Sequence, residues 1–435
     1  MPNRTAIAIA IALGAVFGAT PPPAQAEPIF NYSIGASLQN SDNINLSSTD
    51  PISQNVLAPR LDFRVDEQGS ALSTAAAGTL EYRDYINGAF GNELRTLFAG
   101  NADWHISPDR FDWYAEDNIS RQPINAFESN APSNQQQTNV FSTGPTLRAK
   151  FTDVLRGRFD LRYTNSYADT TKDFNSNRFG TLGSLLYQLD PTDTLSGTVA
   201  ASRTRYIESQ SKQFDYDRYD AYLGYQRNVS EFMLEGAVGY SWLDLRSTDS
   251  RSGSLLRGNL HWNPTPATSL GVSVSHQYSD AALDLVFTPA QLGNTGIGSG
   301  INSAVIAPQV YVENRIGVDI NYRQEKFRVG FAPFWRKLQY VQDATANQRS
   351  PGYYASAQYY LRPTLWLGFY AGQERRRYTA LTRTDDDLAY GISLNLQRTQ
   401  HWLWSLLAEH QRRDSSVVER SYAESSMILT ITYRR

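Results

Sequence analysis

The stretch Leu155-Arg156-Gly157-Arg158-Phe159-Asp160-Leu161-Arg162-Tyr163 decides the fold. Apolar or small side chains alternate with charged ones at every step, which is the two-residue period of a β-strand. A soluble core could not bury the arginines of the charged face, so that face must meet water. The two faces together predict a strand that lies between lipid and an aqueous lumen.

The same alternation recurs along the whole chain, at residues 30–38, 256–262, 312–322 and 388–396. No segment with a helical period is comparably strong. The connections alternate between short turns, such as 190–193 and 324–326, and longer polar segments, such as 40–55, 121–138 and 281–308. Short periplasmic turns and long extracellular loops are typical of bacterial outer-membrane barrels.

We therefore predict an all-β fold, a transmembrane antiparallel up-and-down β-barrel of about 20 strands, with 18 as the alternative and both termini periplasmic. A soluble propeller or solenoid would also contain many short strands. Its repeats should carry compact apolar cores, whereas these strands each have one charged face. The membrane barrel is the favoured prediction.

The N-terminus has the features of a secretory signal. Arg4 precedes an apolar stretch at 6–17, and Ala24-Gln25-Ala26 is a small-x-small cleavage site. We predict a signal peptide at 1–26 and a single barrel domain at 27–435, located in a Gram-negative-type outer membrane. Because strand alternation begins a few residues after the cleavage site, we expect no N-terminal plug or periplasmic domain.

Composition agrees with this fold and excludes some partners. Mean hydropathy is −0.46 although 41% of residues are hydrophobic, as expected where lipid-facing and lumen-facing residues alternate. The aromatic share of 12% suits interfacial girdles, and outer-membrane lipids are the expected surroundings. A net charge of −3 gives no reason to expect nucleic acid as a partner.

The inward faces of the strands are the candidate functional surface, because a barrel of this size leaves an aqueous lumen. Arginine can pair with carboxylates, phosphates or sulfates, and aromatic faces stack on cations or sugar rings. The alternative is that inward Arg and Asp only pair across strands and stiffen the wall. The candidate lumen-lining residues are Arg60, Arg64, Arg95, Tyr114, Arg148, Arg156, Arg158, Arg162, Arg203, Arg205, Arg257, Arg323, Arg328, Trp366 and Tyr370.

The longest loop, 281–308, combines the apolar residues Leu283, Leu285 and Phe287 with a run of glycines at 293–300. An apolar external loop tends to fold inward, where it would constrict or gate the pore. The alternative is a packed cap on the extracellular rim. No lysine follows the glycines, so they are not a phosphate-binding loop.

An enzymatic role has little support. His105 and Ser107 resemble the pair of an outer-membrane phospholipase, but they lie beside a turn at the predicted periplasmic end. No histidine cluster has metal-ligand spacing, so we predict no catalytic residue, no metal and no cofactor.

The segment Tyr32-Ser-Ile-Gly-Ala-Ser-Leu-Gln-Asn-Ser-Asp-Asn-Ile-Asn-Leu46 resembles the opening of the outer-membrane β-barrel porins associated with exopolysaccharide biosynthesis and export operons. Asp42, Asn43 and Ile44 match their Asp-Asn-aliphatic signature, and tight turns followed by Leu-x-Gly extend the likeness. The resemblance implies a channel that exports a polysaccharide with separate periplasmic components. The alternatives are a diffusion porin for uptake of small solutes, including anionic ones, and an outer-membrane hydrolase.

Overall fold

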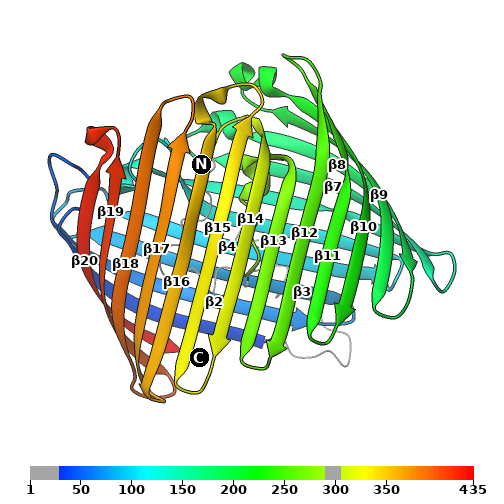
Figure 1. Cartoon of the computed structure of the whole chain (residues 1–435). Coiled ribbons are helices and arrows are strands. Elements are labelled where there is room, and N and C mark those ends of the chain that lie inside the picture. The colour runs from blue at the N-terminus through cyan, green and yellow to red at the C-terminus, as the bar shows by residue number, and fades with distance from the viewer. Residues whose placement is uncertain (1–28, 290–304) are drawn as a thin grey trace.

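The computed structural model describes residues 29–289 and 305–435, so the predicted signal peptide and the glycine run of the longest loop lie outside the described residues. Twenty antiparallel strands each pair with the next, and β20 pairs back with β1, which closes the sheet into a barrel (Figure 1). The prediction of an all-β barrel of about 20 strands is confirmed.

The strands are β1 (Ile29–Ser41), β2 (Gln54–Gln68), β3 (Leu72–Tyr85), β4 (Glu93–Ser107), β5 (Phe111–Pro123), β6 (Gln135–Lys150), β7 (Leu155–Ala168), β8 (Ser176–Gln188), β9 (Asp193–Tyr206), β10 (Tyr216–Val229), β11 (Phe232–Leu245), β12 (Arg251–Thr265), β13 (Thr268–Asp280), β14 (Val310–Arg323), β15 (Phe327–Tyr340), β16 (Gln348–Arg362), β17 (Leu365–Tyr378), β18 (Arg383–Gln397), β19 (Trp402–Ser415) and β20 (Tyr422–Arg434).

Among the described residues, the short helices lie in connections at the long-loop end. They are the 3-10 turns η1 (Pro132–Asn134), η2 (Lys172–Phe174), η3 (Ser209–Phe214), η4 (Ala344–Ala346) and η5 (Val418–Arg420), and the α-helix α2 (Ala281–Asp284). Among the described residues, no helix is long and apolar enough to cross a membrane.

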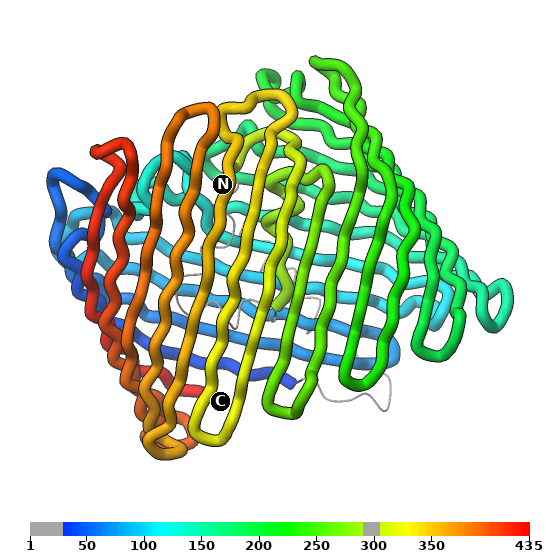
Figure 2. The backbone as a smooth tube through the Cα atoms, viewed as in Figure 1, coloured from blue at the N-terminus to red at the C-terminus, as the bar shows by residue number. Residues whose placement is uncertain are grey.

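The two ends of the barrel differ, as the alternation of connections predicted. Tight turns lie at one end together with the C-terminus, and the longer loops lie at the other (Figure 2). Asp190 shows how a tight turn is fixed, since its Oδ1 accepts hydrogen bonds from the backbone N–H groups of Thr192 at 2.8 Å and Asp193 at 2.9 Å. The hydroxyl and backbone N–H of Thr192 hold the pKa of Asp190 at about 2.

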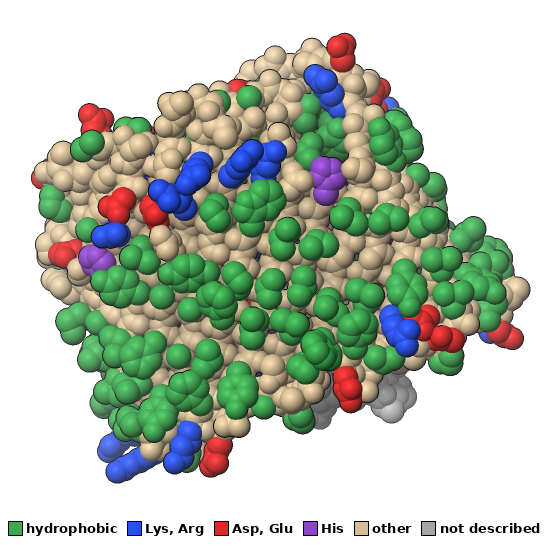
Figure 3. Space-filling view, viewed as in Figure 1, with side chains coloured by type: hydrophobic (Ala, Val, Ile, Leu, Met, Phe, Trp, Pro, Cys, Tyr) green, Lys and Arg blue, Asp and Glu red, His purple; other side chains and the backbone are tan. Residues whose placement is uncertain are grey.

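The outer face of the barrel is an apolar band. Leu94, Val199 and Leu223 are each more than 60% exposed, and tryptophans stand on the same face at both edges, for example Trp104 and Trp242. Figure 3 shows apolar side chains covering the middle of the visible face. Such a surface is stable only in lipid, and Trp concentrates at membrane interfaces. The chain is therefore an outer-membrane β-barrel with its long loops outside.

The hairpin of β13 and β14 leans into the lumen at the long-loop end. Towards the long-loop end, the pairing of β12 with β13 ends at Leu256 and His276. The pairing of β13 with β14 continues further, to Asp280 and Val310. The freed end packs with Tyr278 against inner-face side chains of β10 and β11, including Tyr216 and Leu243. This lean carries α2 away from the wall.

Candidate functional site

Strand register and the exposed apolar residues fix which predicted residues face the lumen. On β2, for example, exposed Leu57 faces out, so Arg60 and Arg64 face in. On β7 the exposed residues Phe159 and Leu161 face out and the arginines face in. The inner face carries Arg60, Arg64, Arg95, Tyr114, Arg148, Arg156, Arg158, Arg162, Arg257, Arg323, Arg328, Trp366 and Tyr370.

The prediction that Arg203 and Arg205 line the lumen is wrong. They share the odd positions of β9 with Leu195 and Val199, whose side chains are 42% and 64% exposed on the outer face. Arg203 and Arg205 pair there with Asp217 at 2.8 Å. They lie near the long-loop end of β9, where the outer face extends above the bilayer and meets water. A charged side chain therefore no longer indicates the lumen at this height.

Five of the ten predicted arginines on the inner face pair with a carboxylate on the same strand. Arg64 Nε lies 2.6 Å from Asp66, and Arg158 Nε lies 2.8 Å from Asp160, two residues along on the same face. Arg60, Arg95 and Arg162 follow the same pattern with Asp62, Glu93 and Asp160. The paired charges weaken the anion preference that the arginines alone would produce. They leave a wall rich in hydrogen-bonding groups.

Aromatic rings lie flat against the inner wall on β15 to β17. Phe334, Tyr354 and Tyr370 are directly opposite Gly352, Gly372 and Gly391 on the next strand. A Cβ at Gly352 would lie 2.5 Å from Phe334 Cζ, and one at Gly391 would lie 2.5 Å from Tyr370 Cε1. Each ring therefore covers its glycine and turns one face away from the wall.

Two further rings extend this aromatic wall towards the periplasmic end. Tyr360 and Trp366 stack with centroids 5.6 Å apart and an angle of 25° between their planes. The Arg328 guanidinium lies 5.0 Å from the centre of the Tyr360 ring. Tyr370 also donates a hydrogen bond of 2.8 Å from its hydroxyl to Glu409. The sequence identified Trp366, Tyr370 and Arg328 but missed Phe334, Tyr354 and Tyr360, because cross-strand register is needed to pair them.

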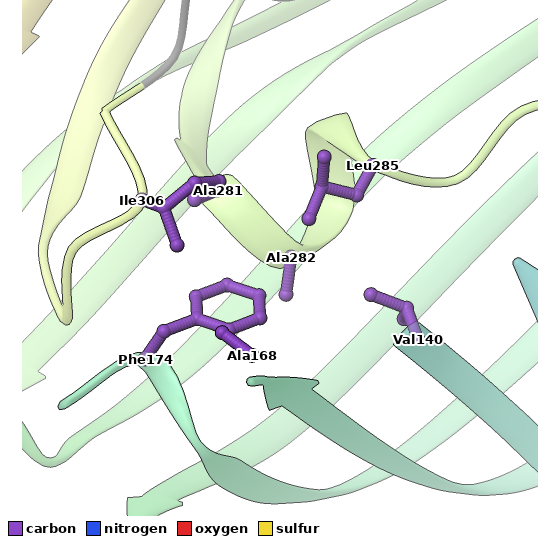
Figure 4. Close-up of a cluster of buried hydrophobic side chains, with 7 residues drawn as sticks. All are labelled: Val140, Ala168, Phe174, Ala281, Ala282, Leu285 and Ile306. Atoms are coloured by element: carbon purple, nitrogen blue, oxygen red, sulfur yellow. The ribbon is translucent and has the colours of Figure 1, made fainter. Parts of the chain in front are cut away.

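The loop 281–309 folds into the lumen in its described parts, which is the first of the two alternatives that its apolar content left open. α2 packs against the opposite wall, where Ala282 lies between Phe174 and Val140 (Figure 4). The loop is also held by buried charges. Asp280 pairs with Arg178 of β8 and accepts a hydrogen bond from Tyr216 of β10.

Asp284, the last residue of α2, is anchored to β15. Its carboxylate pairs with Arg336, whose Nε lies 3.0 Å from Glu313 Oε1, and it accepts a hydrogen bond of 2.5 Å from the Tyr311 hydroxyl. The side chains of this cluster are at most 10% exposed. Burial raises the pKa of Asp284 although Arg336 acts in the opposite direction.

A second loop, 124–134, crosses the mouth from the β5–β6 side to the opposite wall. The Phe127 ring lies 5.2 Å from that of Tyr378, and the Glu128 carbonyl accepts a hydrogen bond of 2.8 Å from Arg413 of β19. Phe127 and Val305 pack against the same cluster of Tyr311, Leu338 and Tyr340. The two loops therefore pack against the same cluster and lie across the extracellular mouth.

The predicted pair His105 and Ser107 is replaced by a different arrangement. His105 Nε2 lies 3.1 Å from Ser73 Oγ, and its Nδ1 lies 2.9 Å from Asp112, which also pairs with Arg148. The order Ser–His–Asp is that of a catalytic triad. Ser73, however, is paired with β2 on one side and β4 on the other, so its own backbone N–H belongs to the sheet and is not available as an oxyanion donor.

We expect Ser73→Ala to leave transport unchanged and a fluorophosphonate probe to leave the wild-type protein unlabelled, because acyl transfer needs oxyanion donors. The check is gel detection of the labelled band in isolated outer membranes. Labelling of the wild type that disappears in Ser73→Ala would instead establish a serine hydrolase. Within residues 29–289 and 305–435, no group of His, Asp and Glu side chains is arranged to hold a metal ion.

No protein-family model and no curated protein matches the sequence. Among solved structures, the chain is similar to a mutant of the ferric enterobactin receptor PfeA from Pseudomonas aeruginosa, with 10% identity, a TM-score of 0.49, and coverage of 95% of this chain and 81% of that one. It is also similar to the siderophore receptor PirA from the same organism (11% identity, TM-score 0.45, coverage 95% and 81%). A third similar structure is OccAB4 from Acinetobacter baumannii, with 10% identity, a TM-score of 0.38, and coverage of 95% of this chain and 100% of that one. These values are too low to carry an argument about function.

Proposed function

We propose that this outer-membrane barrel is a gated channel through which an exopolysaccharide leaves the cell. The aromatic wall of Phe334, Tyr354, Tyr370, Tyr360 and Trp366 is the observation that carries the proposal. The C–H groups of a pyranose ring pack favourably on an aromatic face. A series of such faces, stepping from β15 to β17 towards the periplasmic end, lets a glycan slide from one weak contact to the next.

The charge pattern of the lumen supports the same cargo. Arginines such as Arg64 and Arg158 are paired with carboxylates, which reduces the net positive charge that a long polymer meets and keeps hydrogen-bonding groups on the wall. Conduction requires contacts weak enough to release the polymer, and tight sites would stall it. The loops 124–134 and 281–309 would form the gate. The periplasmic export machinery would consist of separate chains.

The second candidate is a diffusion porin for small solutes. The inward loops favour it, because they obstruct the mouth through which a polymer would have to pass. The two functions differ in their deletion phenotype. Loss of an exporter lowers surface polysaccharide, whereas loss of a porin lowers uptake of a small solute and leaves the polymer unchanged.

We expect deletion of the gene to lower surface polysaccharide several-fold and the wild-type gene to restore it. Tyr354→Ala/Tyr370→Ala should restore it only in part, because each lost ring costs about 1 kcal/mol of glycan contact, or roughly fivefold in affinity. In planar bilayers, current block by fragments of the polymer should weaken by roughly tenfold or more in the same variant.

The matched control is Tyr353→Ala/Phe369→Ala, which removes two aromatics from the outer face of the same strands, one residue away. This variant should restore export fully. Normal polymer output in the deletion strain, with lost uptake of a small solute, would reject export in favour of the porin.

A further inference from the structure

Three cationic side chains stand side by side on the outer face of β15, β16 and β17 at the long-loop end. Lys337 is directly opposite Arg349 in the sheet, and Arg349 is directly opposite Arg377. Directly opposed side chains have Cβ atoms about 5 Å apart, and like charges in such positions destabilise a sheet. We refer to Lys337, Arg349 and Arg377 as the cation row.

No carboxylate compensates the cation row within the described residues. None of its three side chains has an Asp or Glu oxygen within 4.0 Å. The neighbouring outer-face arginines differ, because Arg412 lies 3.0 Å from Asp414 and Arg375 lies 4.0 Å from Asp386. The described residues therefore leave the row open to an anion from outside the chain.

Outer-face cations elsewhere on the same rim are paired. On β9 and the loop after β11, Arg203, Arg205 and Arg246 all contact Asp215 or Asp217. An exposed position above the bilayer therefore does not by itself leave a cation without a partner in this protein. The cation row differs from these three arginines in having no such partner among the described residues.

The height of the row places it at the lipid headgroups. Trp335, an outward tryptophan 37% exposed, precedes Lys337 by two residues on the same face. Two residues of strand rise about 7 Å, and tryptophan marks the membrane interface. Figure 3 shows Lys and Arg side chains gathered above the apolar band, over the upper ends of the strands in front. Since the long loops are extracellular, these are headgroups of the outer leaflet.

We propose that the cation row binds the phosphate groups of a phosphorylated glycolipid of the outer leaflet. Arginine holds phosphate through paired N–H donors, and lysine adds a point charge. Three adjacent strands span about 10 Å, enough to contact a headgroup that bears two phosphates. The low dielectric of the interface strengthens each contact relative to water. This lipid site does not depend on which cargo passes through the lumen.

The test is native mass spectrometry of the full barrel in detergent with three probes: bis-phosphorylated lipid A, enzymatically dephosphorylated lipid A, and inorganic phosphate. The wild type should bind the phosphorylated lipid at least tenfold more tightly than the dephosphorylated one. Lys337→Gln/Arg349→Gln/Arg377→Gln should abolish this difference. Heat-modifiable gel mobility verifies that each variant is folded.

The matched control is Arg203→Gln/Arg205→Gln/Arg246→Gln, which removes three cations from the same rim where each is already paired. It should keep the preference for phosphorylated lipid. Equal binding of the two lipids by the wild type, or an equal loss in the control, would overturn the proposal. Binding of inorganic phosphate as tightly as the lipid would also overturn it, by identifying a free-anion site.

Discussion

Arg336→Ala is expected to open the extracellular mouth. The substitution leaves Asp284 and Glu313 in a buried cluster without their cation, and losing one partner of a buried pair costs about 3–5 kcal/mol. Undocking α2 exposes the two carboxylates to water and relieves that cost. Single-channel conductance in planar bilayers should therefore rise several-fold above that of the wild type.

The effect should depend on pH in a defined direction. Burial already raises the pKa of Asp284, and loss of the Arg336 cation raises it further. A carboxyl with a raised pKa stabilises the docked loop at low pH, where it is protonated, and this stability is lost as pH rises through that pKa. The variant should open more at alkaline than at acidic pH.

Two controls separate gating from general damage to the barrel. Arg60→Ala removes an exposed inner-face pair, worth at most about 1 kcal/mol, and should leave conductance unchanged. Asp284→Asn/Glu313→Gln/Arg336→Met removes all three charges at once and should close the mouth again. Wild-type conductance in Arg336→Ala, together with a lower melting temperature, would show that this loop is no gate.

Arg413→Ala should release the other loop, 124–134. The Arg413 side chain is 2% exposed, lies 2.6 Å from Asp387 and donates a hydrogen bond to the Glu128 carbonyl. Arg376 still compensates the charge of Asp387 in the variant. We therefore expect the stability of the docked loop to fall by about 3 kcal/mol, the low end of the range for a broken buried ion pair. Limited proteolysis of the folded barrel should cut 124–134 at least tenfold faster.

Arg420→Ala is the matched control, because Arg420 pairs with the same Glu128 at 2.8 Å but on the exposed rim. Its loss should cost less than about 1 kcal/mol and leave the cleavage rate nearly unchanged. Equal cleavage in the two variants would contradict a specific role for the buried Arg413 contact.

The sequence predicted the barrel because the alternation of apolar and charged side chains can be seen within each single strand. Each strand such as β7 shows its two faces in nine consecutive residues, and the rhythm of turns and loops supplies the strand count. The same rule failed at Arg203 and Arg205, since alternation indicates a face only where one side meets lipid. Above the bilayer the outer side meets water instead of lipid, so a charged residue no longer identifies the inner side.

The remaining features depend on register and on distant contacts, which a single sequence does not contain. Nothing near Tyr370 indicates that Gly391 lies opposite, and nothing near His105 indicates Ser73. The apolar residues of the loop 281–308 left two alternatives, an inward fold and a packed cap on the rim, and the described parts of the loop fold inward. Its anchors, Arg178 and Arg336, come from strands on either side of it in the sequence and could not be identified in advance.

The two inward loops also act as braces across the cylinder. One ties the hairpin of β13 and β14 to β8 through Asp280 and Arg178, and the other ties the β5–β6 side to β19 through Glu128 and Arg413. A barrel of this width is not filled by side chains, so its round cross-section has little other internal support. Undocking the loops would open the mouth and also remove these ties across the barrel. The open channel should therefore have a less rigid wall than the closed one.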